Sequence, residues 1–219
     1  YMYIFSGVWG FIMGMAFSQL VRMELQSPFQ NIFFKSGIYN NVVTVHAMTI
    51  IFFGVMPTLM GGIGNWFIPM YVSLMDMAHP RLNGYSFWLM PGSLGTAVHA
   101  LYTDNGLGTG WTIYPTLSSD IGSPGRGVDY AIMGLHLAGL SSIMGSVNYM
   151  MTAGPSRKDG HTSSKLGMLP VCLCATGFLL AFSVPVLGGS ITMLLMDRNW
   201  STSFFRPVAG GSLLSFQHM

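Results

Sequence analysis

Two histidines lie deep inside long stretches without charge, where an imidazole could bind a metal or a haem iron. His46 lies between Lys35 and Asp76, and no Asp, Glu, Lys or Arg occurs between those two residues. His136 lies in a second such stretch, 130–156. An ionisable side chain in an apolar, membrane-length segment marks a candidate functional site, and neutral imidazole commonly binds metals and haem. The alternative is that each histidine hydrogen-bonds a neighbouring helix, and position alone leaves both interpretations open.

The two histidines are predicted to lie at similar depth. His46 follows Tyr39 by seven residues, and His136 follows Asp129 by seven. At ~1.5 Å per residue, each ring lies about 10 Å along its helix from that earlier residue. One hypothesis is therefore a haem held by both histidines. The alternative is that only one of them binds a cofactor and the other is a structural hydrogen-bond partner.

A row of amide, hydroxyl and carboxyl side chains forms a second candidate site. Ser141 and Asn148 are seven residues apart, so they share a helix face. Such groups can hold ordered water, which a proton relay across a membrane requires. Ordinary hydrogen bonding between membrane helices is the alternative, which spacing alone favours. The proposed row consists of Asn65, Asp76, Asn83, Ser141, Ser142 and Asn148.

Two further side chains could contact a polar cofactor. Arg22 ends the first apolar stretch, where its guanidinium could hydrogen-bond a cofactor edge or extend to lipid headgroups. Trp111 follows the Gly-rich segment 106–110 and is either an interfacial anchor or an indole N–H donor to an anion. The Gly-rich segment is not a phosphate loop, because no Lys-Ser or Lys-Thr follows it.

The composition is that of a membrane protein. Of the 219 residues, 51% are hydrophobic and only 7% are charged, and the mean hydropathy is +0.51. A soluble domain carries about 25% charged residues. The net charge of +2 and the lack of a basic stripe argue against a nucleic-acid partner.

The charged residues divide the chain into five charge-free stretches. Each stretch is long enough to cross the hydrocarbon core of a bilayer, which needs about 20 helical residues. The sequence therefore predicts an all-α, polytopic membrane helical bundle. The predicted helices cover residues 2–21, 38–70, 85–102, 129–153 and 166–196.

Successive connections should alternate between two sides of the membrane. Side one receives 22–37, 104–128 and 197–219, and side two receives 76–84 and 154–165. Lys and Arg number five on side one and four on side two, so the charge bias leaves the orientation open. Both ends of the sequence lack a polar terminal segment, and we expect the native chain to extend in both directions.

The chain resembles the catalytic subunits of mitochondrial cytochrome c oxidases, subunit 1 of the haem-copper oxidase superfamily. The matching segments run in family order over the whole chain. They include VRMEL at 21–25, IYNNVVTVHAMTIIFFGVMP at 38–57, GGIGNWFIPM at 61–70, DMAHPRLN at 76–83, GTGWTIYP at 108–115 and VDYAIMGLHLAGLSSIMGSVN at 128–148. The resemblance implies that residues 1–219 hold five of the family's twelve helices, within a single transmembrane domain. It also implies an N-terminal piece of the gene, of the kind used as a species barcode.

The resemblance implies a role for each candidate residue. His46 matches an axial ligand of the low-spin haem a, whose second ligand lies in a later helix, so the pairing with His136 is disfavoured. Arg22 matches the arginine that hydrogen-bonds the haem formyl group, and Trp111 matches a tryptophan beside the haem propionates. Asp76 matches the mouth of the proton-uptake path that the polar row continues. Glu24 matches a residue of a peripheral cation site.

The implied function is reduction of dioxygen to water with electrons from cytochrome c, coupled to proton pumping. The implied location is the mitochondrial inner membrane, with side two toward the matrix and other oxidase subunits as partners. Haem a3 and copper B would be held by later segments, starting with a His-Pro-Glu just past Met219, so this piece alone is expected to be inactive. The tail around Arg206 departs from the usual acidic version, which leaves any metal role there open. The alternatives are a quinol oxidase of the same superfamily and a non-redox ion or proton transporter built on Asp76.

Overall fold

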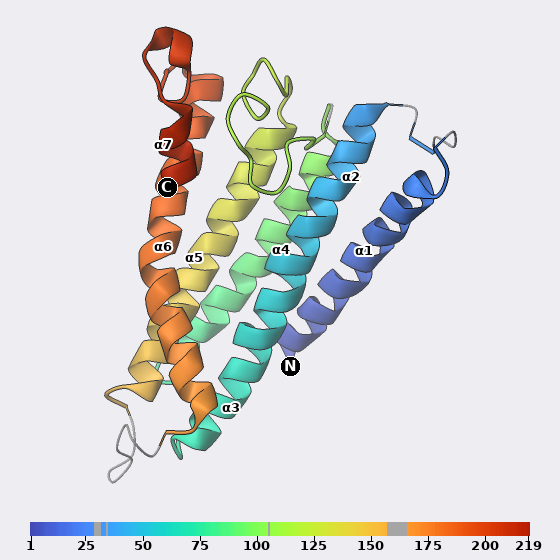
Figure 1. The fold of residues 1–219 in the computed structure, drawn as a ribbon. Helices are drawn as coiled ribbons and strands as arrows, with labels where there is room; N and C mark the ends of the chain where they lie inside the picture. Colours follow the sequence, from blue (N-terminus) through green and yellow to red (C-terminus); the bar gives the residue numbers. More distant parts are fainter. Residues whose placement is uncertain (29–31, 34, 105, 157–165) are drawn as a thin grey trace.

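A computed structural model describes residues 1–28, 32–33, 35–104, 106–156 and 166–219. Long helices run side by side, and no β-strand occurs in the described residues, so the predicted all-α bundle is confirmed (Figure 1). The elements are α1 (Met2–Leu25), α2 (Ser36–Met48), the π-helical η1 (Thr49–Val55) and η2 (Pro57–Gly64), α3 (Asn65–Tyr71), α4 (Pro80–Tyr102), α5 (Gly127–Ala153), α6 (Met168–Asn199), the 3-10 turn η4 (Pro207–Ala209) and α7 (Leu213–His218). Most of the predicted connection 154–165 lies outside the described residues.

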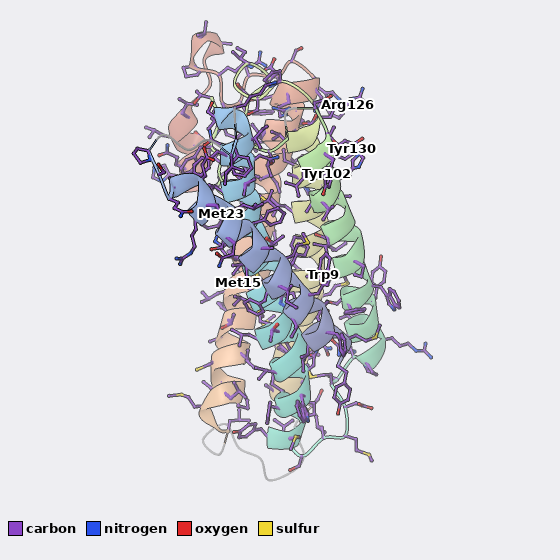
Figure 2. All side chains as sticks on the ribbon, turned by 90° about the vertical axis from the view of Figure 1, so that its right-hand side faces the viewer. Trp9, Met15, Met23, Tyr102, Arg126 and Tyr130 are labelled. Atoms are coloured by element: carbon purple, nitrogen blue, oxygen red, sulfur yellow. The ribbon has the colours of Figure 1, made fainter. Side chains whose placement is uncertain are left out.

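Four helical segments in the described part of the chain are long and apolar enough to cross a membrane. They are Met2–Leu25, Ser36–Tyr71, Gly127–Ala153 and Met168–Asn199. The outer side of α1 is apolar, as contact with lipid requires: Trp9, Met15 and Met23 are each about half exposed (Figure 2). The other long helix, α4, is less apolar and packs mainly against α5.

The contact between α4 and α5 explains why α4 can carry so many small polar residues. Ser93 Oγ donates to the carbonyl of Gly134 at 2.6 Å, and Ser86 Oγ donates to the carbonyl of Ser141 at 2.8 Å. Hydroxyl groups that bond across a helix pair are satisfied inside a membrane. Ser86 and Ser93 of α4 therefore face α5, and both hydroxyls are hydrogen-bonded across this contact.

Several helices extend beyond the predicted ends. Helix α1 continues through Arg22 and Glu24, and α6 continues to Asn199. Helix α4 begins at Pro80, because proline is favoured in the first helical turn, where its missing N–H has no helical partner. Asn83 therefore lies inside α4, and its placement in the preceding connection is wrong.

The second span is continuous from Ser36 to Tyr71, but its middle is π-helical. Pro57 lacks an N–H group, and in an α-helix its ring would crowd the carbonyl four residues earlier. The wider π turn accommodates it: the N–H of Met56 bonds the carbonyl of Ile51, five residues earlier. The sequence predicted one helix over 38–70, and the π geometry of its middle is a finding of the structure.

Glycines on one side of α1 allow close contact with this π-helical segment. A Cβ on Gly7 would lie 2.0 Å from Thr58 Oγ1, and a Cβ on Gly10 would lie 2.3 Å from the carbonyl oxygen of Phe53. Real Cβ contacts are essentially never that short. Only glycine therefore lets the two backbones approach so closely.

Gly10→Ala is expected to destabilise the bundle, because the added methyl group meets backbone atoms that cannot rotate away. The expected loss is about 1–3 kcal/mol, typical of overpacking a close contact. Gly95→Ala in α4 is the matched control, since its Cβ would meet nothing within 4 Å. Thermal unfolding of the assembled protein in detergent measures both variants, and equal stability of the two would contradict the close contact.

Candidate functional site

His46 is oriented by a backbone carbonyl of the neighbouring helix. Its Nδ1 lies 2.8 Å from the carbonyl oxygen of Gly14 in α1. A carbonyl oxygen only accepts, so Nδ1 carries a proton, and in the neutral tautomer Nε2 then has the lone pair. No hydrogen-bond partner for Nε2 is found among the described residues. This is the arrangement of a metal-binding histidine, whose second nitrogen commonly donates to a carbonyl.

Gly14 makes this contact possible. A Cβ at that position would lie 2.3 Å from Cγ1 of Ile50, so a larger residue would push α1 away from the second span. The displacement would lengthen the bond between the Gly14 carbonyl and the ring of His46. The close helix packing therefore sets the tautomer and direction of the imidazole.

His136 has a different environment, because both of its ring nitrogens are engaged. Nδ1 lies 2.8 Å from the carbonyl oxygen of Ile132 in its own helix, and Nε2 lies 2.9 Å from Thr192 Oγ1 in α6. Neither nitrogen is free for a metal in this arrangement. His136 thus links α5 to α6, while His46 faces α1, and the geometry favours a structural role for His136.

The side-one connection that carries Trp111 is attached to the helix that carries His46. Asn41 Oδ1 accepts from the N–H of Leu107 at 2.8 Å, and Thr44 Oγ1 accepts from the N–H of Gly110 at 3.0 Å. Thr44 precedes His46 by two residues, so the loop is attached about 3 Å along the helix axis from the level of that histidine. Trp111 follows directly and is about half exposed.

Arg22 and Glu24 lie near the side-one end of α1. Arg22 is exposed and follows Gly14 by eight residues, about 12 Å along the helix. Glu24 Oε2 accepts from the N–H groups of Ile32 at 2.7 Å and Phe33 at 3.1 Å. The carboxylate therefore binds the backbone that follows α1. Within the described residues, we find no group of three or more His, Cys, Asp or Glu that could hold a metal ion.

Most of the predicted polar row converges on one small cavity. Ser86 and Ser141 exchange hydrogen bonds, and the Tyr3 hydroxyl lies 2.8 Å from Ser86 Oγ. The cavity measures about 40 Å³, and roughly 10–15 Å³ suffices for one water molecule. Its polar lining residues are Tyr3, Asn65, Asn83, Ser86, Ser141, Ser142 and Tyr149.

Asp76 borders a second cavity that shares two lining residues with the first. This cavity measures about 270 Å³, and Asn65 and Asn83 belong to both linings. Asn65 Nδ2 donates to Asn83 Oδ1 at 2.9 Å, so this hydrogen bond lies where the two cavities meet. Asp76 is exposed, which places a carboxylate at the outer cavity on side two.

Asn148 is not brought to either cavity. Its Oδ1 accepts from the N–H of His79 at 3.0 Å, and its Nδ2 donates to the His79 carbonyl at 3.3 Å. Thr152 Oγ1 accepts from the N–H of Ala78 at 3.0 Å. Asn148 and Thr152 thus attach the turn after Asp76 to α5, and Asn148 lines neither of the two cavities.

Sequence reasoning missed three polar residues of the 40 Å³ cavity, namely Tyr3, Ser86 and Tyr149. Ser86 follows Asn83 by three residues on α4, so helical spacing could have identified it. Tyr3 lies on α1, and no spacing within one helix predicts that its hydroxyl reaches α4.

Comparison with known proteins shows which family this sequence is similar to. A family model described as "Cytochrome C and Quinol oxidase polypeptide I" matches residues 1–219. Three curated relatives carry the name "Cytochrome c oxidase subunit 1". The sequence from Mytilus edulis is 44% identical over the whole chain, which covers 40% of that relative. The sequence from Pecten maximus is 43% identical over the whole chain and 46% of the relative. That from Eremothecium gossypii is 41% identical over 99% of the chain and 41% of the relative. The chain thus spans less than half the length of these relatives.

Proposed function

The chain belongs to the family of cytochrome c and quinol oxidase polypeptide I, and we propose that it forms part of the catalytic subunit of a terminal respiratory oxidase. The proposed activity of the full-length subunit is reduction of dioxygen to water with electrons from cytochrome c, coupled to proton pumping. The names of the three relatives support this activity. Since the chain spans less than half of each relative, the complete reaction requires residues beyond this sequence.

The single observation that carries the proposal is the environment of His46. Its Nδ1 donates to the Gly14 carbonyl, and its Nε2 is left as a free ligand in an apolar helix. An imidazole nitrogen of this kind can bind haem iron, and we propose that His46 would hold the iron of haem a. When bound, the haem supplies reversible one-electron chemistry. By the resemblance, haem a3 and copper B are held elsewhere in the full-length subunit.

Arg22 and Trp111 are proposed to hydrogen-bond the polar edge of the same haem. Arg22 is exposed at the side-one end of α1, where its guanidinium is free to donate. Trp111 is held near the side-one end of α2 by the bond from Gly110 to Thr44. An indole N–H and a guanidinium both donate to anionic or carbonyl groups. Their role is to orient the haem and to neutralise its charge.

The two cavities on side two are proposed to carry protons inward. Asp76 would collect protons at the outer cavity, and the Asn65–Asn83 pair would pass them to the inner cavity. Ser141 and Ser142, together with Tyr3 and Ser86, would hold the water there. Asn148 is proposed to hold the turn after Asp76 in place. A cation bound at Glu24 remains a prediction of the resemblance.

The full-length protein is proposed to lie in the mitochondrial inner membrane with side two toward the matrix. Its partners would be the other oxidase subunits, with cytochrome c as the electron donor. The apolar helices support a multi-pass membrane protein. A matrix-facing side two would place the Asp76 cavity where pumped protons enter.

Oxygen consumption by the purified complex that contains this subunit tests the proposal. We expect rapid turnover with reduced cytochrome c and little with a quinol. Turnover with a quinol alone would support the quinol oxidase of the same family. Ion flux without oxygen consumption would overturn the oxidase assignment and favour a transporter that uses Asp76.

A further inference from the structure

Two β-branched residues of the side-one connection have backbone φ angles that such residues rarely adopt. Ile113 has φ +53° and Thr116 has φ +80°. Positive φ is a true outlier for β-branched residues, because the side chain crowds the backbone. Such conformations persist only where surrounding contacts enforce them, and they cluster at functional sites. Ile113 follows Trp111 by two residues in this connection, so contacts that enforce the backbone at Ile113 also bear on that indole.

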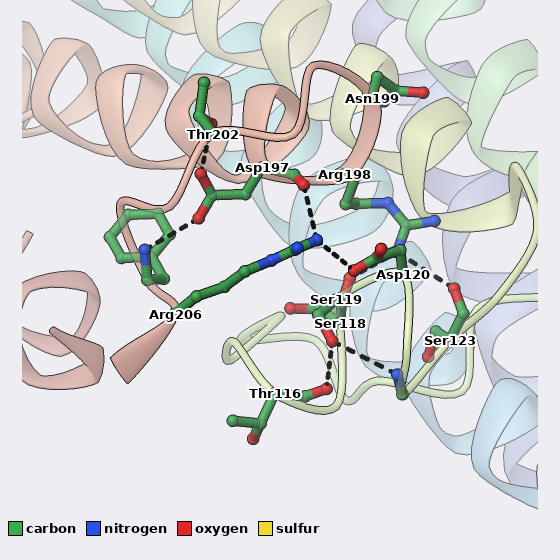
Figure 3. A network of polar contacts seen from close by, with 12 residues as sticks. Thr116, Ser118, Ser119, Asp120, Ser123, Asp197, Arg198, Asn199, Thr202 and Arg206 are labelled. Carbon is green, nitrogen blue, oxygen red and sulfur yellow. Dashed lines mark hydrogen bonds and ion pairs between the residues drawn. The ribbon is translucent and has the colours of Figure 1, made fainter. Parts of the chain in front are cut away.

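Arg198, in the last turn of α6, binds the later part of the same connection. Its Nη1 donates to the carbonyls of Ser118 at 2.6 Å and Ser123 at 3.1 Å (Figure 3). Its Nη2 donates to the carbonyl of Gly125 at 2.6 Å. Its Nε donates to Asp129 Oδ1 at 2.7 Å. The side chain of Arg198 is only 3% exposed. Three of these hydrogen bonds go to carbonyls of the connection and the fourth goes to Asp129 in α5, so one planar guanidinium holds the connection against that helix.

A second set of bonds extends from Arg198 toward Trp111. Ser118, whose carbonyl Arg198 binds, donates its own Oγ to the carbonyl of Ile113 at 3.0 Å. On the other side of Trp111, the N–H of Gly110 donates to Thr44 on the helix of His46. Trp111 therefore lies between one anchor on α2 and one anchor that leads to α6.

We infer that Arg198 is a positioning residue for Trp111, which it holds over the side-one end of the helix that carries His46. The inference rests on the proposed haem site and extends it by a residue that does not touch the haem. A lysine in place of Arg198 retains the charge but cannot make four bonds in one plane. Loss of the Arg198 guanidinium would free the carbonyl of Ser118 and weaken the bond from Ser118 to Ile113. The indole of Trp111 would then lose its anchor on this side.

A neighbouring ion pair serves as the control. Arg206 donates to Asp120 Oδ1 at 2.6 Å, but the side chains of Arg206 and Asp120 are 35% and 45% exposed. Arg206 also donates to the carbonyl of Asp197 and makes no described bond to the segment 110–118 (Figure 3). Arg206→Met thus removes a cation from the same side of the membrane without releasing Trp111.

The experiment uses the complete oxidase that carries this subunit, with the variants Arg198→Lys, Trp111→Phe, the double variant and Arg206→Met. The readouts are the midpoint potential of the low-spin haem and amide hydrogen exchange in 106–126. We expect Arg198→Lys to shift the potential in the same direction as Trp111→Phe. The double variant should shift it no further than Trp111→Phe alone, because Arg198 acts through that indole. Amides near Ser118 should exchange about tenfold faster or more in Arg198→Lys, since charge-assisted bonds are lost.

Two outcomes would overturn the inference. One is additive shifts of Arg198→Lys and Trp111→Phe, which would mean that Arg198 acts on the potential independently. The other is faster exchange in Arg198→Lys without any change in potential, which would mean a structural role alone. Arg206→Met should leave the potential and the exchange of amides 110–118 unchanged. A potential shift in that variant equal to that of Arg198→Lys would also overturn the inference, because it would arise without release of the segment that holds Trp111. The proposed function fails separately, if His46 variants retain the low-spin haem.

Discussion

Replacing His46 by alanine in the complete oxidase will abolish the absorption band of the low-spin haem. The imidazole Nε2 is the atom proposed to bind the iron, and alanine leaves that axial position without a ligand. The bond from Nδ1 to the Gly14 carbonyl holds the ring in place. Optical spectra of the reduced enzyme measure the band, and haem extraction measures how much haem remains.

His136→Ala is the matched control, because it removes the other imidazole at similar depth. His136 bonds Ile132 and Thr192, so its loss should cost about 1 kcal/mol of interhelical hydrogen bonding. The low-spin band should remain in this variant. Loss of the band in His136→Ala together with its retention in His46→Ala would contradict the assignment of the iron ligand.

Asp76→Asn in the complete oxidase is expected to lower proton uptake from side two. The variant keeps the shape of the side chain at the outer cavity but removes the charge that attracts protons. Local charge raises the capture rate of an oppositely charged particle by roughly 10–1000-fold, so turnover should fall about tenfold or more. Oxygen consumption and proton release by the enzyme in sealed vesicles measure the effect.

Asp104→Asn is the control for a change of charge alone. Asp104 lies on side one, where it accepts from the N–H of Arg126 at 3.1 Å. Asparagine also accepts that bond and tolerates the positive φ of this position. Turnover should stay normal in this variant. If Asp76→Asn also turned over and pumped normally, the proposed path through Asn65 and Asn83 would be wrong.

The membrane bundle could be predicted from the order of residues alone. Charged side chains rarely lie in a hydrocarbon layer, so the gaps between them mark the spans. The same reasoning identified His46, because it is an ionisable group inside a charge-free stretch. It identified Asp76 as a carboxylate at the side-two end of the polar row. Helix ends were less certain, since residues such as Arg22 and Asn83 can continue a helix into the interface.

The sequence by itself thus determined the spans, the depth of the two histidines and the carboxylate on side two, because hydropathy and helical spacing act along one chain segment. Only the tertiary structure decided which histidine is free. His46 and His136 have the same spacing, but one meets the carbonyl of Gly14 and the other meets Thr192. It also decided that Tyr3 joins the inner cavity and that Asn148 binds the His79 backbone instead. These partners lie on different helices, and their contacts depend on how closely glycines allow the helices to pack, which no spacing within a single helix encodes.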